Sequence, residues 1–355
     1  MANRPFGRWL FGATAVIASV AGCSLQNGDD RGDPVFFWES DYGYEAVSIL
    51  GESTQVEADR LALFGVMDLV RTNAGYLVVD SGNDRLLLFD WKTGLARIVG
   101  REGSGPGEFQ FPTRIARWGD TLVVLDANLR RVSRFSLDGG FVSTIPVWGN
   151  SEDVALHPSL GILVVTDADR HHYLARLNEL EPDKAPLAFA PIPTGLGMEA
   201  AAYFQARTDR VAVTPDGTIH VLDGRHLALV SYGIDGSVIS VLYLPEEERA
   251  RRMEENRLED EALGGPRVVV ASPIIDRLEA LPDGRLFATV PRLATDPEHR
   301  IGYVLDLENR EAISVRLPPR LSEWGSSLFL DGDRLVVART RTGMALFELA
   351  LLDQE

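Results

Sequence analysis

A repeat of 46 residues is the feature that most constrains how this chain can fold. LVVDSGNDRLLLFDWKTG (77–94) and LVVLDANLRRVSRFSLDG (122–139) share one plan. Each has an apolar segment ending in Asp, a polar turn with Asn and then Arg, a second apolar segment ending in Phe, and a turn closed by Gly. Asp80 and Asp126 are 46 residues apart, and so are Phe89 and Phe135. Agreement at two positions indicates a structural repeat.

Weaker copies follow in the second half of the chain. They cover residues 161–177, 217–236, 283–309 and 331–350. All consist of short runs of Val, Leu and Ile separated by Asp-Gly, Asn and Gly turns, which is typical of β-strands. A repeat of this length holds four strands, and one such blade cannot bury both of its faces, so blades stack around an axis. We predict an all-β fold, a six-bladed β-propeller, over residues 42–355.

Ring closure needs a strand from the start of the chain. YEAVSIL (44–50) is strand-like and precedes the first full copy. Because an open ring would expose sheet edges, we expect this segment to complete the last blade.

The stretch GREGSGPGEF (100–109) could be a phosphate-binding loop or a structural turn. A phosphate loop needs Gly-Lys-Ser/Thr at the start of a helix, and a dinucleotide loop also needs a helix after its glycines. Here Gly107 is followed by Glu108, Phe109 and a β segment, and the glutamates would repel phosphate. We interpret the stretch as a tight crossover that uses positive φ angles, with Phe109 anchored between blades.

These residues also carry a family resemblance. The pattern comprises Gly105, Pro106, Gly107, Phe109, Pro112, Asp126, Asn128 and either Arg130 or Arg131. It resembles NHL-repeat propellers, especially six-bladed relatives among bacterial lipoproteins, and the match is strongest over residues 67–140. The boundaries of the third and fifth copies stay open. Gluconolactonase-like and lyase relatives of this plan are enzymes, but their motifs do not match this sequence residue by residue.

The N-terminus has the features of an export signal. A basic start and a short apolar run lead to Val20-Ala21-Gly22-Cys23, and Cys23 is the only cysteine of the chain. VAGC resembles the bacterial lipobox, in which the cysteine is acylated after cleavage. We predict a lipoprotein signal peptide at residues 1–22, lipid attachment at Cys23 and a flexible tether at residues 23–41. The protein would then be anchored to a bacterial membrane, facing the periplasm.

Charge and side-chain chemistry limit the possible functions. The formal charge of −17 disfavours nucleic acid and anionic lipid as partners. The repeated Asp80, Asn83 and Arg85 pattern recurs from blade to blade, so we interpret it as turn structure rather than a catalytic cluster. The scattered histidines, which are His157, His171, His172, His220, His226 and His299, suggest no metal site. We therefore name no catalytic, cofactor-binding or metal-binding residue and predict no cofactor, while a calcium ion in the channel stays open.

One segment departs from the β pattern. PEEERARRMEENRLEDEAL (245–263) has Pro and three glutamates at its start and Gly264 and Gly265 at its end, which predicts a helical insertion. We expect it to be mostly solvated, either as a surface decoration or as a flap over one face.

Taken together, these features predict a monomeric, exported, lipid-anchored propeller. We expect it to act as a binding or scaffolding module for a protein, peptide or carbohydrate at the cell envelope. The alternative is a metal-dependent hydrolase or lyase with its site in the central channel.

Overall fold

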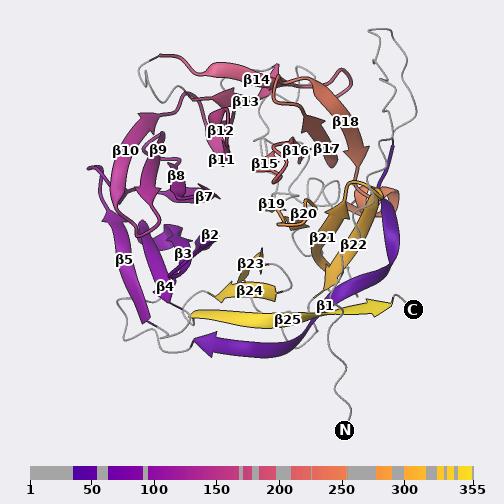
Figure 1. The fold of residues 1–355 in the computed structure, drawn as a ribbon, viewed down its shortest axis with the longest axis horizontal. Coiled ribbons are helices and arrows are strands. Elements are labelled where there is room, and N and C mark those ends of the chain that lie inside the picture. Colours follow the sequence, from indigo (N-terminus) through magenta and orange to yellow (C-terminus); the bar gives the residue numbers. More distant parts are fainter. Residues whose placement is uncertain are drawn as a thin grey trace, which may run out of the picture. The chain divides into compact units, whose positions relative to one another are not determined.

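The strands of the protein are arranged as blades around a central axis, as the computed structural model shows (Figure 1). It describes residues 35–53, 63–90, 95–167, 171–177, 184–196, 209–224, 226–252, 254, 277–289, 300–316, 326–331, 334–339 and 343–353. All of them belong to one compact unit, Pro34–Glu355. The strand nearest the axis in each blade is β2, β7, β11, β15, β19 or β23 (Figure 1).

The first three blades are separate sheets. Blade 1 contains β2 (Val66–Thr72), β3 (Gly75–Asp80), β4 (Arg85–Asp90) and β5 (Leu95–Glu102), with the short β6 (Glu108–Phe109) at its outer edge. Blade 2 contains β7 (Pro112–Trp118), β8 (Thr121–Asp126), β9 (Arg131–Ser136) and β10 (Phe141–Pro146). Blade 3 contains β11 (Ser151–His157), β12 (Gly161–Thr166), β13 (His172–Arg176) and β14 (Leu187–Pro191).

The other blades complete the ring. Blade 4 contains β15 (Arg210–Val213), β16 (Ile219–Asp223), β17 (Ala228–Tyr232) and β18 (Val238–Tyr243). Blade 5 contains β19 (Arg277–Ala280), β20 (Leu286–Thr289), β21 (Arg300–Asp306) and β22 (Glu311–Arg316). Blade 6 contains β23 (Ser326–Asp331), β24 (Arg334–Arg339), β25 (Gly343–Asp353) and β1 (Trp38–Ser53). The six predicted copies supply the two middle strands of the six blades, which confirms the six-bladed propeller.

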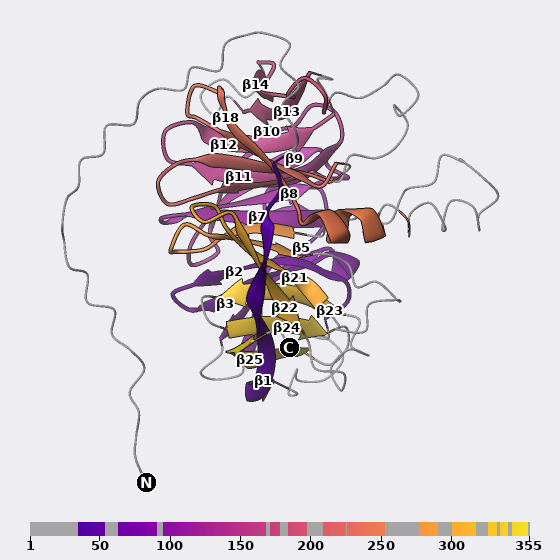
Figure 2. The same ribbon diagram turned by 90° about the vertical axis from the view of Figure 1, so that its right-hand side faces the viewer.

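Strand β1 closes the ring, as predicted for residues 44–50. It pairs antiparallel with β25 from Tyr42 to Ser53 and so becomes the outermost strand of blade 6. It also pairs in parallel with β22 of blade 5, so these two blades form one eight-stranded sheet. Figure 2 shows β1 running along the side of the ring past β21, β22 and β25. The N-terminal strand therefore joins two blades, because it satisfies hydrogen-bonding edges on both sides.

The predicted start of the propeller is too late. Residues 38–41, assigned to the tether, belong to β1, and Phe37 donates its N–H to Tyr243 O at 2.8 Å. Phe37 is also buried in the core between blades 4 and 5. Because Phe37 is buried and residues 38–41 pair in β1, the folded unit includes residues just before position 42. The signal peptide and the rest of the tether lie outside the described residues.

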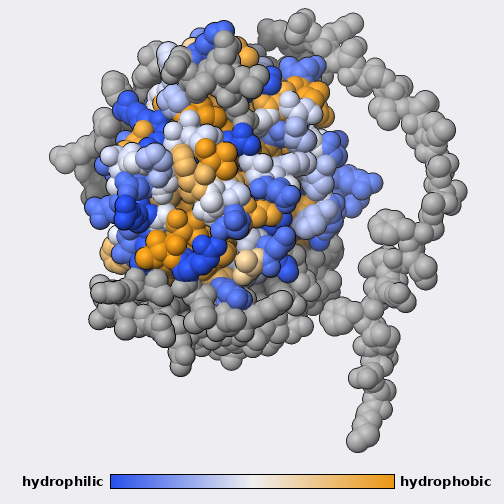
Figure 3. All heavy atoms as spheres, turned by 60° about the vertical axis from the view of Figure 1, so that its left-hand side comes forward, coloured by the Kyte–Doolittle hydropathy of each residue, from blue (hydrophilic) through white to orange (hydrophobic). Residues whose placement is uncertain are grey.

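Apolar contacts between neighbouring blades form the core. One cluster joins Val79 and Leu86 of blade 1 to Leu122 and Val124 of blade 2, and similar clusters lie between blades 2 and 3, 3 and 4, and 4 and 5. The middle strands are almost fully buried, whereas the outer strands are mixed, as in Figure 3, where hydrophobic groups lie among hydrophilic ones. The burial of apolar side chains between blades is the main contribution to the stability of the fold, since no blade has a core of its own.

The repeated Asp holds the turn after the second strand, as predicted. Asp80 accepts the N–H of Phe64 and the side-chain amide of Asn83, and Asp126 accepts the N–H groups of Gln110 and Leu129. Four residues after the repeated Asp, the backbone enters the left-handed region. The residues at this place are Asp84 (φ 49°), Arg130 (φ 47°), Leu227 (φ 54°) and Arg310 (φ 56°). Such φ values are costly for non-glycine residues, so the carboxylate and its hydrogen bonds stabilise the turn.

The arginine of the pattern is Arg131 rather than Arg130, which occupies the left-handed position. Arg131 donates to the carbonyl oxygens of Ser104, Gly105 and Glu108, so it holds the glycine-rich crossover against blade 2. Arg85 instead pairs with Asp80 of its own blade at 2.8 Å. The repeated arginine thus contacts the crossover from the preceding blade at Arg131 and the repeated Asp of its own blade at Arg85.

GREGSGPGEF is a structural turn, as predicted. Gly103 and Gly107 have φ values of 149° and 74°. The Glu108 carboxylate accepts the N–H of Gly105 at 2.9 Å, so it occupies the place where a bound phosphate would need N–H donors. Phe109 is fully buried between blades 1 and 2.

The predicted insertion begins as a helix, and residues 246–252 and 254 are helical within the part that the structure describes. Its expected solvation is wrong at two positions: Glu248 and Arg252 are buried and form an ion pair. Arg251 also pairs with Glu248, at 2.5 Å. Arg249 lies over the ring of Tyr243 at 5.0 Å, so the first turns of the helix are tied to blade 4.

Candidate functional site in the central channel

A cavity of about 510 Å³ lies in the channel and is lined by the innermost strands of blades 1 to 5. Its volume is within the range of small-molecule sites, about 300–1,000 Å³. Asp68, Arg114, Asp153 and Arg277 line its deeper part, near the beginnings of their strands. Near the strand ends, Arg71 is exposed and Arg117 and Trp118 are half-buried, so we call this end of the cavity its mouth.

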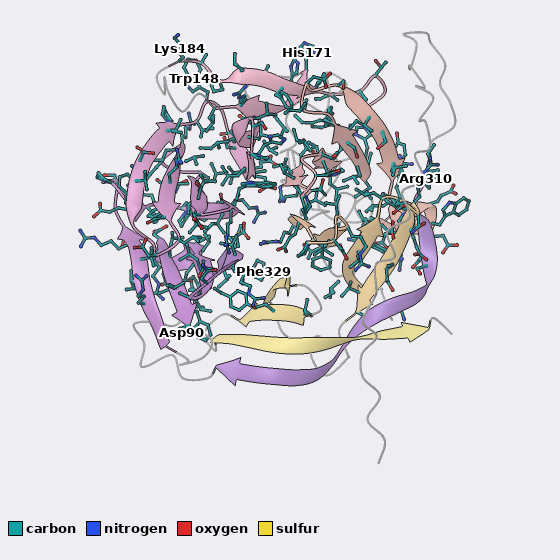
Figure 4. All side chains as sticks on the ribbon, in the orientation of Figure 1. Asp90, Trp148, His171, Lys184, Arg310 and Phe329 are labelled. Atoms are coloured by element: carbon teal, nitrogen blue, oxygen red, sulfur yellow. The ribbon has the colours of Figure 1, made fainter. Side chains whose placement is uncertain are left out.

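Asp68 and Arg277 form one charge pair of the channel. Asp68 is buried, and its carboxylate accepts the N–H of Leu69 at 2.7 Å and the N–H of Ile115 in blade 2 at 2.9 Å. Arg277 of blade 5 forms an ion pair with Asp68 and donates to Leu69 O at 3.1 Å. Its guanidinium lies 4.6 Å from the ring centroid of Phe329 on β23 of blade 6, the residue labelled in Figure 4. Arg277 therefore spans blade 6 and connects blade 5 to blade 1.

Asp153 and Arg114 form a second charge pair. Asp153 accepts the N–H of Val154 and that of Val211 in blade 4, both at 2.9 Å. Arg114 Nε lies 3.8 Å from the Asp153 carboxylate, and Arg114 Nη1 donates to Met67 O of blade 1 at 3.1 Å. Burial raises the pKa of Asp153 above its ordinary value, while Arg114, Arg210 and the two N–H groups act in the opposite direction.

These four side chains satisfy the inner edges of the blades. An innermost strand has no further strand beside it, so its edge groups need other partners. Asp68 and Asp153 bind edge N–H groups of the next blade, and Arg114 and Arg277 bind carbonyl oxygens of β2. The charges deep in the channel are thus engaged in holding blades together. Sequence analysis missed them, although Asp68 and Arg114 are separated by the repeat period of 46 residues.

The mouth of the cavity has two different sides. Arg71 and Arg117, from the corresponding positions of blades 1 and 2, lie on one side together with Trp118. The other side is apolar and consists of Leu156, Val213, Ala280 and Pro282. Arg117 donates to Gly119 O at 3.0 Å and to Arg71 O at 2.5 Å, which fixes its guanidinium at the mouth. This arrangement can bind a ligand that has one polar end and an apolar body.

None of the described histidines lines this cavity. His157 Nδ1 accepts the N–H groups of Ser159 and Leu160, and Nε2 bonds to Gly217 O of blade 4 at 3.0 Å, so His157 joins two blades. His220 is buried between Ser231 and Thr214, and burial lowers its pKa to about 4. His226 bonds to Asp223 at 3.1 Å and takes the place that Asn83 has in blade 1.

Three further features are a metal site, a membrane-spanning helix and the lipidation site. Within the described ranges, histidine, cysteine and acidic side chains form no group of three able to hold a metal ion. The same ranges contain no helix that is long and apolar enough to cross a membrane. Cys23, the single predicted modification site, lies outside the described residues.

Comparisons with known proteins agree on the fold. A family model described as a 6-bladed beta-propeller matches residues 58–154. No curated protein matches the chain.

Among solved structures, a predicted exported protein of Bacteroides fragilis NCTC 9343 has 13% identity and a TM-score of 0.56, with 89% of this chain and 98% of that chain covered. A streptogramin B lyase also has 13% identity, with a TM-score of 0.50 and coverage of 89% and 96%. A predicted gluconolactonase has 13% identity, a TM-score of 0.50 and coverage of 90% and 96%. At these identities the likeness concerns the fold alone. The chain is a six-bladed β-propeller.

Proposed function

We propose that the protein is exported, anchored to a bacterial membrane by lipid on Cys23, and works as a binding module that takes its ligand into the mouth of the central channel. The VAGC sequence after a basic start and an apolar run supports export and lipidation. Acyl chains contribute about 0.8 kcal/mol per buried methylene, which is sufficient for anchoring when several chains are present.

The observation that best supports the binding role is that the channel carboxylates already have hydrogen-bond partners. Asp68 and Asp153 each bind two backbone N–H groups and face an arginine, so their oxygens are already engaged in the structure of the ring. A metal ion or a proton-transfer step would have to displace these partners. The cavity above them remains large enough for a small ligand. Binding at the mouth therefore fits these contacts better than metal-dependent chemistry at the axis.

The test is ligand capture with a blocked channel. Residues 34–355 are incubated with an extract of the cell envelope, and bound compounds are identified by native mass spectrometry. Ala280→Trp should fill the mouth and abolish capture, because Ala280 lines the cavity. Ile239→Trp is the matched control, since Ile239 is 55% exposed on the outer strand β18. Equal capture by the wild type and Ala280→Trp would place the ligand elsewhere, and conversion of the captured compound would favour the enzyme alternative.

A further inference from the structure

We propose that the channel ligand is an organic carboxylate with an apolar body, recognised by Arg117 and held against Trp118. This inference rests on the proposed binding role of the channel and adds the chemical class of its ligand. It starts from the mouth of the cavity, where a guanidinium, an indole and an apolar wall face one space.

Arg117 supplies the positive charge. Its two hydrogen bonds go to carbonyl oxygens, those of Gly119 and Arg71, and among the described residues no carboxylate pairs with it. Nε and Nη1 are used in these bonds, so Nη2 is the nitrogen left to meet a ligand. Carbonyl partners orient a guanidinium but do not neutralise it, which leaves a preorganised cation at the mouth.

The carboxylates that line the cavity are engaged by arginines other than Arg117. Asp68 and Glu279 both pair with Arg277, and Asp153 faces Arg114. The lining of the cavity contains four arginines and three acidic residues, although the whole chain has a formal charge of −17. A locally positive mouth in a strongly acidic protein favours a ligand with a negative group at one point.

The opposite side defines the body of the ligand. Leu156, Val213, Ala280 and Pro282 offer no charged group to a ligand. Trp118 packs against the apolar core between blades 2 and 3, which fixes its indole at the cavity wall. An apolar or aromatic body would fill this side, while its carboxylate reaches Arg117.

The test uses two probes that differ in charge and little in shape, 2-naphthoate and 2-naphthamide. Calorimetric titration of residues 34–355 should show about tenfold or tighter binding of naphthoate, the effect of a hydrogen bond to a charged group. Arg117→Gln should remove this preference, so that the two probes bind the variant with similar affinity. Arg97→Gln is the matched control, because Arg97 also donates to a carbonyl oxygen, that of Asp138, but lies outside the cavity.

Two outcomes would overturn the inference: a preference for naphthoate that survives in Arg117→Gln, or absence of binding of both probes to the wild type. Neither outcome refutes the binding role itself. That role is refuted separately when capture of an envelope ligand is insensitive to Ala280→Trp. A captured ligand that is lost with Ala280→Trp but unaffected by Arg117→Gln would retain the function and reject the carboxylate.

Discussion

Replacing Arg277 with methionine should destabilise the ring by about 3 kcal/mol. Arg277 forms an ion pair with Asp68, donates to Leu69 O and lies over Phe329, and its side chain is only 13% exposed. Loss of one partner from a buried pair costs about 3–5 kcal/mol because the other charge remains buried. Asp68 keeps its two N–H donors, so we expect the lower end of this range.

Urea unfolding of residues 34–355 measures the effect. Arg285→Met is the matched control in the same blade, since Arg285 pairs with the half-exposed Asp283, and such exposed pairs contribute about 1 kcal/mol or less. The double variant Asp68→Asn, Arg277→Met should recover part of the loss, because the more buried of the two carboxylates that pair with Arg277, Asp68 rather than Glu279, no longer carries a charge. An Arg277→Met effect no larger than that of Arg285→Met would refute the role of Arg277 as a connection across blade 6.

Three further predictions concern other parts of the molecule. Burial lowers the pKa of His220 to about 4, so the unfolded chain takes up this proton first and stability falls as the pH drops from about 6.5 toward 4. Between pH 7 and pH 5, urea unfolding should show about 2 kcal/mol more loss for the wild type than for His220→Gln, and equal losses would contradict this. Deletion of residues 38–53 should abolish cooperative unfolding of the propeller in calorimetry, because β1 pairs with both β22 and β25; an unchanged midpoint would be inconsistent with ring closure by β1. Cys23→Ser should leave the protein without lipid, as mass spectrometry of the membrane fraction would show, whereas normal processing and retention of this variant would exclude the lipobox.

The repeat was sufficient to predict the architecture. The spacing of Asp80 and Asp126 identified the middle strands, because the same turn connects the second and third strands of every blade. The turn residues also followed from their chemistry, since a carboxylate that binds backbone N–H groups stabilises a left-handed residue. The choice between Arg130 and Arg131 could not be made in advance, because it depends on which of them enters the left-handed region.

The channel was not predicted, for a physical reason. Asp68 and Arg277 are 209 residues apart, and their pairing exists only when blades 5 and 1 are placed around the axis. Nothing in the sequence around either residue distinguishes it from a charged residue on a solvated strand. The buried pair of Glu248 and Arg252 shows the same limit, because the sequence predicts a charged helix there, but only packing decides which of its charges are buried.

Hydroxyl-radical footprinting of the anchored protein tests the central claim most directly, namely that ligand binds at the channel mouth. Trp118 lines the mouth, whereas Trp148 is 50% exposed and lies at the outer rim (Figure 4). The two indoles therefore report on the two candidate surfaces within one sample. Addition of the captured envelope ligand should lower the oxidation of Trp118 and leave that of Trp148 unchanged. Protection of Trp148 with unchanged oxidation of Trp118 would contradict the claim and move the binding surface to the outer rim of the blades.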